Sequence, residues 1–302
     1  VRDTPIDDRE CGLTLLRDGT LLLHCWSTFH TPEAYRSYPP DAYPEGVVER
    51  WMAVADSPEY RAAEGEHGGW VLSSPDAGRT WTLVGPGPDS IHGGIHLSSG
   101  EILVASYREQ GGTIGIDVAS PTDLQWSRRS TVPCPQTAER TFGEPHVAEL
   151  PTGRVILMIR STKKNPYSDS HTENFLWMSY SDDGGRSWAE VSRTAVWGLP
   201  PHLLVLGDGR LLCTYGYRRA PYGVRACISD DGIQWDTAGE IVIRDDAPNG
   251  DLGYPHSLEI EPGRILTVYY QVDSDDPADA AHPPLPVRRK AEILGTFWDI
   301  PL

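Results

Sequence analysis

Apolar residues along this chain fall in short runs separated by polar turns, and one arrangement of them occurs five times. An apolar run, a turn that ends in glycine and a second apolar run follow one another each time. Short apolar runs bounded in this way predict antiparallel β-strands joined by tight turns. The five segments read LTLLRDGTLLLHC, GIHLSSGEILVAS, HVAELPTGRVILM, HLLVLGDGRLLCT and HSLEIEPGRILTV. Their turn glycines are Gly19, Gly100, Gly153, Gly209 and Gly263, which lie 81, 53, 56 and 54 residues apart.

A second repeated element is a polar turn that ends in tryptophan. It reads SSPDAGRTW at 73–81, SYSDDGGRSW at 179–188 and CISDDGIQW at 227–235, and ASPTDLQW at 119–126 is a weaker match. Asp and Gly favour tight turns because the Asp side chain binds nearby backbone and Gly accepts a positive φ. Each unit is therefore expected to form four antiparallel strands. Four-stranded units repeated at this interval predict an all-β fold, a β-propeller, with each tryptophan packed between neighbouring blades.

The repeats predict one propeller domain over residues 1–302 with five visible units. The ring would have six blades if an N-terminal blade is missing or split. The first unit carries an insertion at about 28–66, expected to hold a short helix and to cover or flank the central cleft. The fifth unit lacks a clear fourth strand, and the sequence VRDT at 1–4 is expected to supply it and close the ring. A second long loop is expected over 272–289.

Charge and composition narrow the possible partners. The 302 residues include 43 acidic and 26 basic side chains, a formal net charge of −17, which argues against nucleic acid and against an anionic membrane surface. An anionic ligand would need a local cluster of arginines. No apolar run is long enough to predict a transmembrane helix and no secretory signal is recognisable, so the compartment stays open. The five cysteines lack metal-site spacing and are read as small core residues.

The turns of the form S-x-D-x-G-x-[ST]-W resemble the Asp boxes of the sialidase superfamily. That resemblance implies a site with three arginines that bind a substrate carboxylate, a tyrosine nucleophile assisted by a glutamate, and an aspartate acid/base. Glu144 in EPHVAELPTG is similar to the family's glutamate, and Tyr254 in DLGYPHSLEI to its tyrosine. Arg160 in LMIRST and Arg225 in YGVRACISDDG are similar to two of its arginines.

The N-terminal half resembles the family less closely. Arg9 in RECGL is a loose match to the first arginine, and Asp8 beside it would line the pocket in another role. The loop RAAEGEHGGW, where the resemblance places the aspartate, offers Glu66 and His67 instead as candidates for the acid/base. The resemblance therefore implies an exo-glycosidase that acts on a terminal acidic carbohydrate, a sialic or related ulosonic acid.

The residues themselves agree with these roles. Glu144 and Tyr254 each lie two residues before a histidine at the same position of their units, so both should begin an innermost strand and face the central pocket. A carboxylate beside a phenol can act as its base and make it nucleophilic. A neutral nucleophile also avoids repulsion by a substrate carboxylate. Arginines such as Arg160 can bind that carboxylate through two parallel hydrogen bonds.

A competing hypothesis starts from the histidines. His146, His202 and His256 each lie seven residues before their turn glycine, and His92 lies eight before its own. Side chains at equivalent positions of different blades converge on one axis, where histidines could bind a divalent metal. Such a site resembles that of some propeller polysaccharide lyases, and this resemblance implies a lyase that acts on uronate polysaccharides. The histidines could equally bond neighbouring strands, with no cofactor at all. A third hypothesis is a carbohydrate-binding propeller without catalysis.

Overall fold

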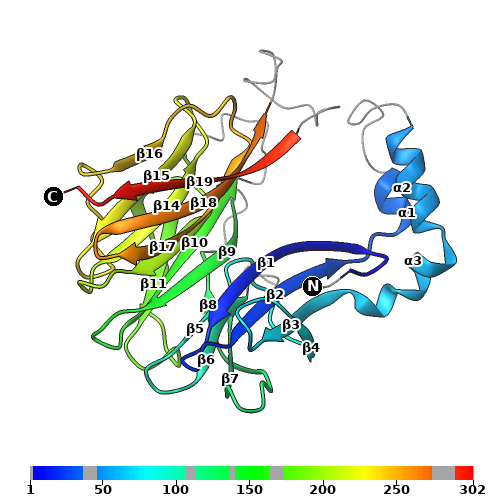
Figure 1. The fold of residues 1–302 in the computed structure, drawn as a ribbon, viewed down its shortest axis with the longest axis horizontal. Coiled ribbons are helices and arrows are strands. Elements are labelled where there is room, and N and C mark those ends of the chain that lie inside the picture. Colours follow the sequence, from blue (N-terminus) through cyan, green and yellow to red (C-terminus); the bar gives the residue numbers. More distant parts are fainter. Residues whose placement is uncertain are drawn as a thin grey trace.

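The strands form five antiparallel sheets that follow one another around a common centre (Figure 1). The computed structural model describes residues 3–36, 46–106, 113–135, 140–163, 173–273 and 290–301. The predicted all-β propeller with five blades is confirmed, and each blade is one repeat unit.

Four blades have four strands each, in sequence order from the innermost to the outermost. Blade 1 contains β1 (Asp7–Leu15), β2 (Leu21–Thr28), β3 (Gly68–Ser74) and β4 (Thr82–Pro86). Blade 2 contains β5 (Gly94–His96), β6 (Ile102–Ser106), β7 (Thr113–Ala119) and β8 (Ser127–Pro133). Blade 3 contains β9 (Arg140–Glu149), β10 (Val155–Lys163), β11 (Phe175–Ser181) and β12 (Ser192–Trp197). Blade 4 contains β13 (Pro201–Val205), β14 (Leu211–Tyr217), β15 (Gly223–Ser229) and β16 (Ile241–Arg244).

Blade 5 contains three strands within the described residues: β17 (Leu252–Glu261), β18 (Arg264–Asp273) and β19 (Lys290–Asp299). The prediction that the N-terminal residues supply its fourth strand is wrong. Asp3 and Thr4 lie in no strand, and Thr4 instead donates two hydrogen bonds to the Asp8 carboxylate. Residues 1–2 lie outside the described part, as do 274–289 of the second expected long loop.

The polar turns are built as their sequence predicts. Asp76, Asp183 and Asp231 each accept a backbone N–H from three or four residues further on, at 2.8 Å. Such bonds hold the turn closed because they satisfy amide groups that no strand can reach. Trp188 then packs into the core between blades 2 and 3, and Trp235 into the core between blades 3 and 4. The prediction that the repeat tryptophans pack between blades is confirmed for these two and for Trp126, which lies between blades 1 and 2. It is wrong for Trp81, which packs in a cluster of residues of its own blade.

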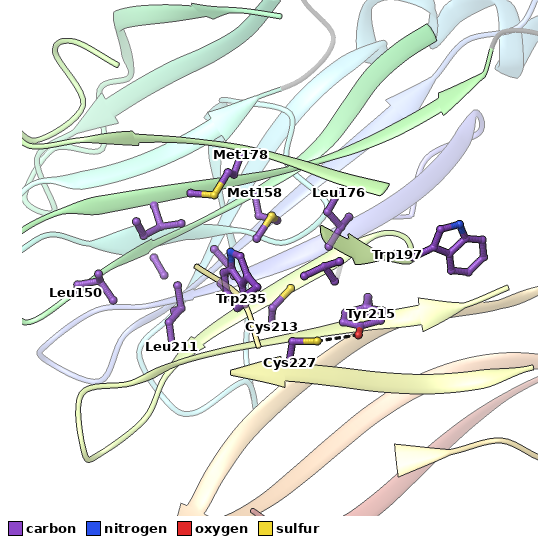
Figure 2. Packing of buried hydrophobic residues seen from close by; sticks show 14 of the residues in the cluster. Leu150, Met158, Leu176, Met178, Trp197, Leu211, Cys213, Tyr215, Cys227 and Trp235 are labelled. Atoms are coloured by element: carbon purple, nitrogen blue, oxygen red, sulfur yellow. Dashed lines mark hydrogen bonds between the residues drawn. The ribbon is translucent and has the colours of Figure 1, made fainter. Parts of the chain in front are cut away.

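The largest core lies between blades 3 and 4 (Figure 2). Met158, Met178 and Leu176 of blade 3 meet Cys213 and Tyr215 of blade 4 there, and all five side chains are buried. Similar apolar cores join blade 1 to blade 2, blade 2 to blade 3 and blade 4 to blade 5. Burial of facing sheets in this way is the main stabilising contribution in a propeller.

The insertion in the first unit contains three short helices where one was expected: α1 (Pro32–Arg36), α2 (Val47–Ala55) and α3 (Pro58–Ala62), followed by a 3₁₀ turn, η1 (Glu64–Glu66). They stand at one side of blade 1, at the right of Figure 1. Tyr60 is buried against Ile6 and Phe29, which attaches the helices to the blade. No helix among the described residues is long and apolar enough to cross a membrane.

Candidate active site

Glu144 on β9 and Tyr254 on β17 occupy the same position in blades 3 and 5, and both have an unusual backbone. Their φ angles are 46° and 50°, in the left-handed region that residues with a side chain rarely adopt. Each lies at a bulge, between Gly143 and His146 on β9 and between Gly253 and His256 on β17. Strained backbone of this kind is concentrated at functional sites, and its occurrence at matching positions of two blades makes Glu144 and Tyr254 candidate site residues.

The side chains of Glu144, Tyr254 and Arg160 form one hydrogen-bonded group, named here the mouth cluster. The Tyr254 hydroxyl donates to Glu144 Oε1 at 2.8 Å. Arg160, near the end of β10, donates through Nη1 to Glu144 Oε2 at 2.5 Å and to the Tyr254 hydroxyl oxygen at 3.0 Å. The side chains of Arg160 and Glu144 keep 21% and 16% of their surface exposed, so the group is largely buried and still reachable.

The electrostatics of the mouth cluster keep the phenol protonated and the guanidinium charged at neutral pH. Burial and the Glu144 charge raise the pKa of Tyr254 to about 12, while Arg160 and Arg218 act in the opposite direction. Burial lowers the pKa of Arg160, but the charges of Glu144 and Tyr254 and their hydrogen bonds outweigh it and the pKa is raised. A phenol with a raised pKa attacks only if a base takes its proton, and Glu144 is in contact with that proton.

Two residues that the sequence did not single out, Arg218 and Tyr270, lie beside Tyr254. Arg218 donates to the carbonyl oxygen of Leu252 at 2.8 Å, and its guanidinium lies 5.9 Å from the centre of the Tyr254 ring. Tyr270 has its ring 5.9 Å from that of Tyr254 and donates to Asp251 at 2.7 Å. The repeat held a signal for Tyr270, because Arg160 and Tyr270 each lie seven residues after the turn glycine of their units.

The structure places Arg225 apart from this group. It lies on β15, donates to Glu240 at 2.5 Å, and stacks on the ring of Tyr217 with 3.5 Å between guanidinium carbon and ring centre. None of the contacts found for Arg225 within the described chain is with the mouth cluster. The arginine of blade 4 that reaches Tyr254 is Arg218, in the turn between β14 and β15, and not the one that the sequence indicated.

The four candidates from the first unit make their described contacts within that unit. The Asp8 carboxylate accepts the hydroxyls of Ser27 and Thr4, and Arg9 lies 3.6 Å from Asp7. The backbone oxygen of Glu66 accepts the indole N–H of Trp70. The Nδ1 atom of His67 accepts the amide of Phe29, and its ring meets that of Trp26 edge to face. The structure therefore does not bring these four side chains into the mouth cluster by any described contact.

His92, His146, His202 and His256 converge as their positions predict, and they are named here the axial histidines. Ring centres of successive pairs are 5.0, 4.6 and 4.6 Å apart, and His256 lies 5.3 Å from His92. Burial lowers the pKa of all four, that of His256 to about 4, so the rings are neutral at pH 7.

The bonds of the axial histidines favour a structural role. His146 accepts the amide of Leu203 at 2.7 Å, and His202 accepts the amide of Ser257 at 3.4 Å, so each ring ties its blade to the next. Within the described ranges no group of three or more His, Cys, Asp and Glu side chains is arranged to hold a metal ion. The rings therefore fit the hypothesis of strand bonding better than that of a metal centre.

Comparisons with known proteins agree with the fold. A family model described as a BNR repeat-like domain matches residues 45–266. No match was found among curated protein sequences. A solved structure of a protein of unknown function from Dyadobacter fermentans is 24% identical to this chain, with a TM-score of 0.66. The match covers 97% of this chain and 77% of that one.

Two further solved structures are glycosidases by their descriptions. The α-L-arabinofuranosidase of Fusarium graminearum in complex with arabinobiose is 12% identical, with a TM-score of 0.53 and coverage of 98% of this chain and 95% of that one. The intramolecular trans-sialidase from Ruminococcus gnavus in complex with oseltamivir carboxylate is 11% identical, with a TM-score of 0.52 and coverage of 89% and 74%. At these identities the likeness shows the fold alone.

Proposed function

Because the chain belongs to the BNR repeat-like domain family, we propose that it is a glycosidase that removes a terminal acidic sugar, a sialic or related ulosonic acid. One observation carries the proposal: the Tyr254 hydroxyl donates to Glu144 while Arg160 bridges the two. A phenol, its base and a cation in one group suit attack on an anomeric carbon that bears a carboxylate, because an uncharged nucleophile is not repelled by it.

In the proposed reaction the substrate carboxylate is held by Arg160 and Arg218. Arg160 already shares one nitrogen with Glu144, which leaves its remaining N–H groups for the substrate. Arg218 takes the place that the sequence gave to Arg225, since Arg225 is occupied by Glu240 and Tyr217. Two guanidinium groups beside Tyr254 would offset the net charge of −17 locally, where an anionic sugar has to bind.

The chemistry then runs in two steps. The Tyr254 oxygen attacks the anomeric carbon, its proton passes to Glu144, and the glycosidic C–O bond breaks as the leaving oxygen takes a proton from an acid. Water next attacks the anomeric carbon and gives one proton to the deprotonated acid, which restores it. The bond to Tyr254 breaks, and Glu144 returns the proton to the phenolate. In this proposal the first blade supplies the acid, and Glu66 and His67 remain the candidates for it.

A substrate screen tests the proposal. Sialyl-oligosaccharides, arabino-oligosaccharides and uronate polysaccharides are offered in parallel, and both free sugar and the ultraviolet absorbance of a new C=C bond are followed. The proposal expects free acidic sugar without absorbance, and a loss of at least about 10³-fold in kcat/KM for Tyr254→Phe. The matched control is Tyr180→Phe, whose ring stacks on Arg154 at 4.5 Å outside the mouth cluster.

The other outcomes separate the alternatives. Release of arabinose but not of acidic sugar would keep a glycosidase and reject the acidic substrate. Rising absorbance would reject hydrolysis in favour of a lyase. Binding of an acidic sugar without turnover, unchanged by Tyr254→Phe, would reject catalysis and leave a carbohydrate-binding propeller.

A further inference from the structure

Two pairs of cysteines face each other directly across neighbouring strands. The register of blade 1 places Cys11 on β1 opposite Cys25 on β2. The register of blade 4 places Cys213 on β14 opposite Cys227 on β15. Directly opposite residues of antiparallel strands have their side chains on the same face of the sheet. Four of the five cysteines therefore form two cross-strand pairs, and Cys134, just after β8, belongs to neither.

The two pairs differ in their access to solvent. Cys11 is exposed, and Cys25 beside it is 5% exposed. Cys213 and Cys227 are both 0% exposed, within the core between blades 3 and 4 (Figure 2). The expectation that the cysteines are core residues is therefore wrong for Cys11. A reagent in solution can reach the pair of blade 1 through Cys11, whereas the core shields the pair of blade 4.

The two pairs also differ in their place in the backbone hydrogen-bond ladder. Along an antiparallel ladder, hydrogen-bonded and non-hydrogen-bonded pairs of residues alternate. The first turn of blade 1 closes with a bond from the Leu16 amide to the Thr20 carbonyl oxygen. The register runs without interruption from that turn to Cys11 and Cys25, five positions further on. Five alternations from a hydrogen-bonded pair lead to a non-hydrogen-bonded pair, so Cys11 and Cys25 form one.

In blade 4 the same count gives the opposite result. The Leu206 amide donates to the Arg210 carbonyl oxygen, and Cys213 pairs with Leu203 three positions further on, without hydrogen bonds between the two. The backbone N–H and C=O of Cys213 therefore point to β15, which makes Cys213 and Cys227 a hydrogen-bonded pair. Opposite Cα atoms are about 5.5 Å apart in such a pair and about 4.5 Å apart in a non-hydrogen-bonded one. The Cβ atoms of a disulfide lie about 3.5 to 4.5 Å apart, which favours the closer pair, that of blade 1.

We propose that Cys11 and Cys25 are a redox modification site, at which a reversible disulfide joins β1 to β2, while Cys213 and Cys227 stay thiols. The bond would lie next to the bulge between Arg9 and Cys11, where the Asp8 carboxylate already accepts the hydroxyl of Ser27 across the same two strands. It would hold the inner hairpin of blade 1 closed. The inference stands on register and exposure and does not rest on the proposed function, so it can hold where that function fails.

The oxidant in this proposal is a small disulfide of the glutathione class. Cys11 loses its proton, its sulfur attacks one sulfur of glutathione disulfide, and a first glutathione leaves as the S–S bond breaks. Cys25 then loses its proton, its sulfur attacks the sulfur of Cys11, and the second glutathione leaves. The two protons end on the two glutathione thiols. Two protein thiols are oxidised, and one glutathione disulfide is reduced.

Peptide mapping tests the proposal without a mutation. The folded, reduced protein is incubated with glutathione disulfide, remaining thiols are blocked with N-ethylmaleimide, and trypsin digestion follows without a reductant. Trypsin cuts after Arg17, so Cys11 and Cys25 fall in separate peptides, 10–17 and 18–36. The buried pair likewise falls in separate peptides, 211–218 and 226–244, and serves as the internal control. The proposal expects peptides 10–17 and 18–36 to be linked at least about tenfold more than the control peptides.

A variant separates this disulfide from other products of oxidation. Cys11→Ser changes an exposed side chain, so we expect the variant to fold and Cys25 to stay a thiol after the same treatment. Dithiothreitol should return the oxidised protein to five thiols. A protein in which peptides 10–17 and 18–36 stay separate would overturn the proposal. So would a lasting mixed disulfide of Cys11 with glutathione, a dimer linked through Cys11, or equal linkage of the two pairs.

Discussion

Two layers lie along the axis of this propeller, two residues apart on the same strands, and they are built for different purposes. The mouth cluster places a carboxylate, a phenol and a guanidinium in direct contact, with φ angles of 46° and 50° at Glu144 and Tyr254. The axial histidines are neutral buried rings, and two of them, His146 and His202, accept a backbone amide of the next blade. Strain and charge are concentrated in the first layer, and burial and inter-blade bonds in the second.

The difference shows how one repeat serves both stability and chemistry. The repeat presents two positions to the axis that lie two residues apart. One is filled by a histidine in blades 2 to 5 and the other varies, with Glu144 in blade 3 and Tyr254 in blade 5. Only the variable position carries reactive groups, and its backbone is held in an unfavourable conformation by the sheet around it. The layer of histidines should therefore respond to pH through folding, and the mouth cluster through activity. Four predictions test that separation, from the largest expected effect to the smallest.

The axial histidines should make the fold sensitive to acid. Their pKa values are lowered by burial, to about 4 for His256, while in the unfolded chain they take up protons near pH 6.5. Unfolding therefore binds protons below pH 6.5, and the free energy of unfolding falls as pH decreases from 6.5 towards 4. Each histidine contributes up to about 1.4 kcal/mol per pH unit in that window. Tm values measured from pH 8 to pH 5 should be constant above pH 7 and fall steeply below 6.5.

A single substitution tests which rings are responsible. His202→Gln should reduce the slope of the pH dependence by about one proton, because it removes one of the buried neutral imidazoles. A Tm that stays constant down to pH 5 would show that the four rings are not held neutral by the fold.

Glu144→Gln should remove most of the activity and change the stability of the fold only slightly. An amide cannot take the proton of the Tyr254 hydroxyl, so we expect kcat to fall by about 10² to 10⁴-fold on the substrate that the screen identifies. The matched control is Glu173→Gln in the same blade, whose carboxylate also pairs with an arginine, Arg140. Steady-state kinetics of both variants provide the measurement. Equal losses in the two would mean that Glu144 acts on the fold and not on the reaction.

The sequence predicted the residues of the mouth cluster better than it predicted site residues in the first unit. The repeat explains this difference. Glu144 and Tyr254 could be matched because both precede a histidine at a fixed distance from a turn glycine, and strands convert such distances into positions. The resemblance indicated Arg160, and its side chain reaches Glu144 because β10 pairs directly with β9. Tyr270 could have been found by the same count.

The rest depended on information that spacing does not contain. Arg218 lies in the turn between β14 and β15, and Arg225 lies on β15. Only the pairing of Arg225 with Glu240 decides which of the two arginines faces Tyr254. The insertion moves Glu66 and His67 away from any repeat position, so a count of residues could not locate them. The expected fourth strand of blade 5 did not come from Asp3 and Thr4, because Thr4 is bound to the Asp8 carboxylate of blade 1.

Arg160→Met should lower kcat/KM by about 10²-fold. The substitution removes a guanidinium that donates to both Glu144 and Tyr254 and that, in the proposed reaction, binds the substrate carboxylate. Arg160→Lys keeps the positive charge and should restore part of the rate. Steady-state kinetics of the two variants provide the measurement. An unchanged kcat/KM in Arg160→Met would contradict the role of Arg160 in holding the substrate.

Arg218→Lys should have the smallest effect and the most selective one. The side chain lies beside Tyr254 and Tyr270, and lysine keeps its charge but loses the fork of parallel donors that fits a carboxylate. We expect KM for an acidic substrate to rise about tenfold, which corresponds to about 1.4 kcal/mol, with kcat changed less than twofold. Arg154→Lys, at a turn where the arginine pairs with Asp182, is the control and should leave KM unchanged. A KM that does not respond to Arg218→Lys would remove Arg218 from carboxylate binding and leave Arg160 as the anchor in the mouth cluster.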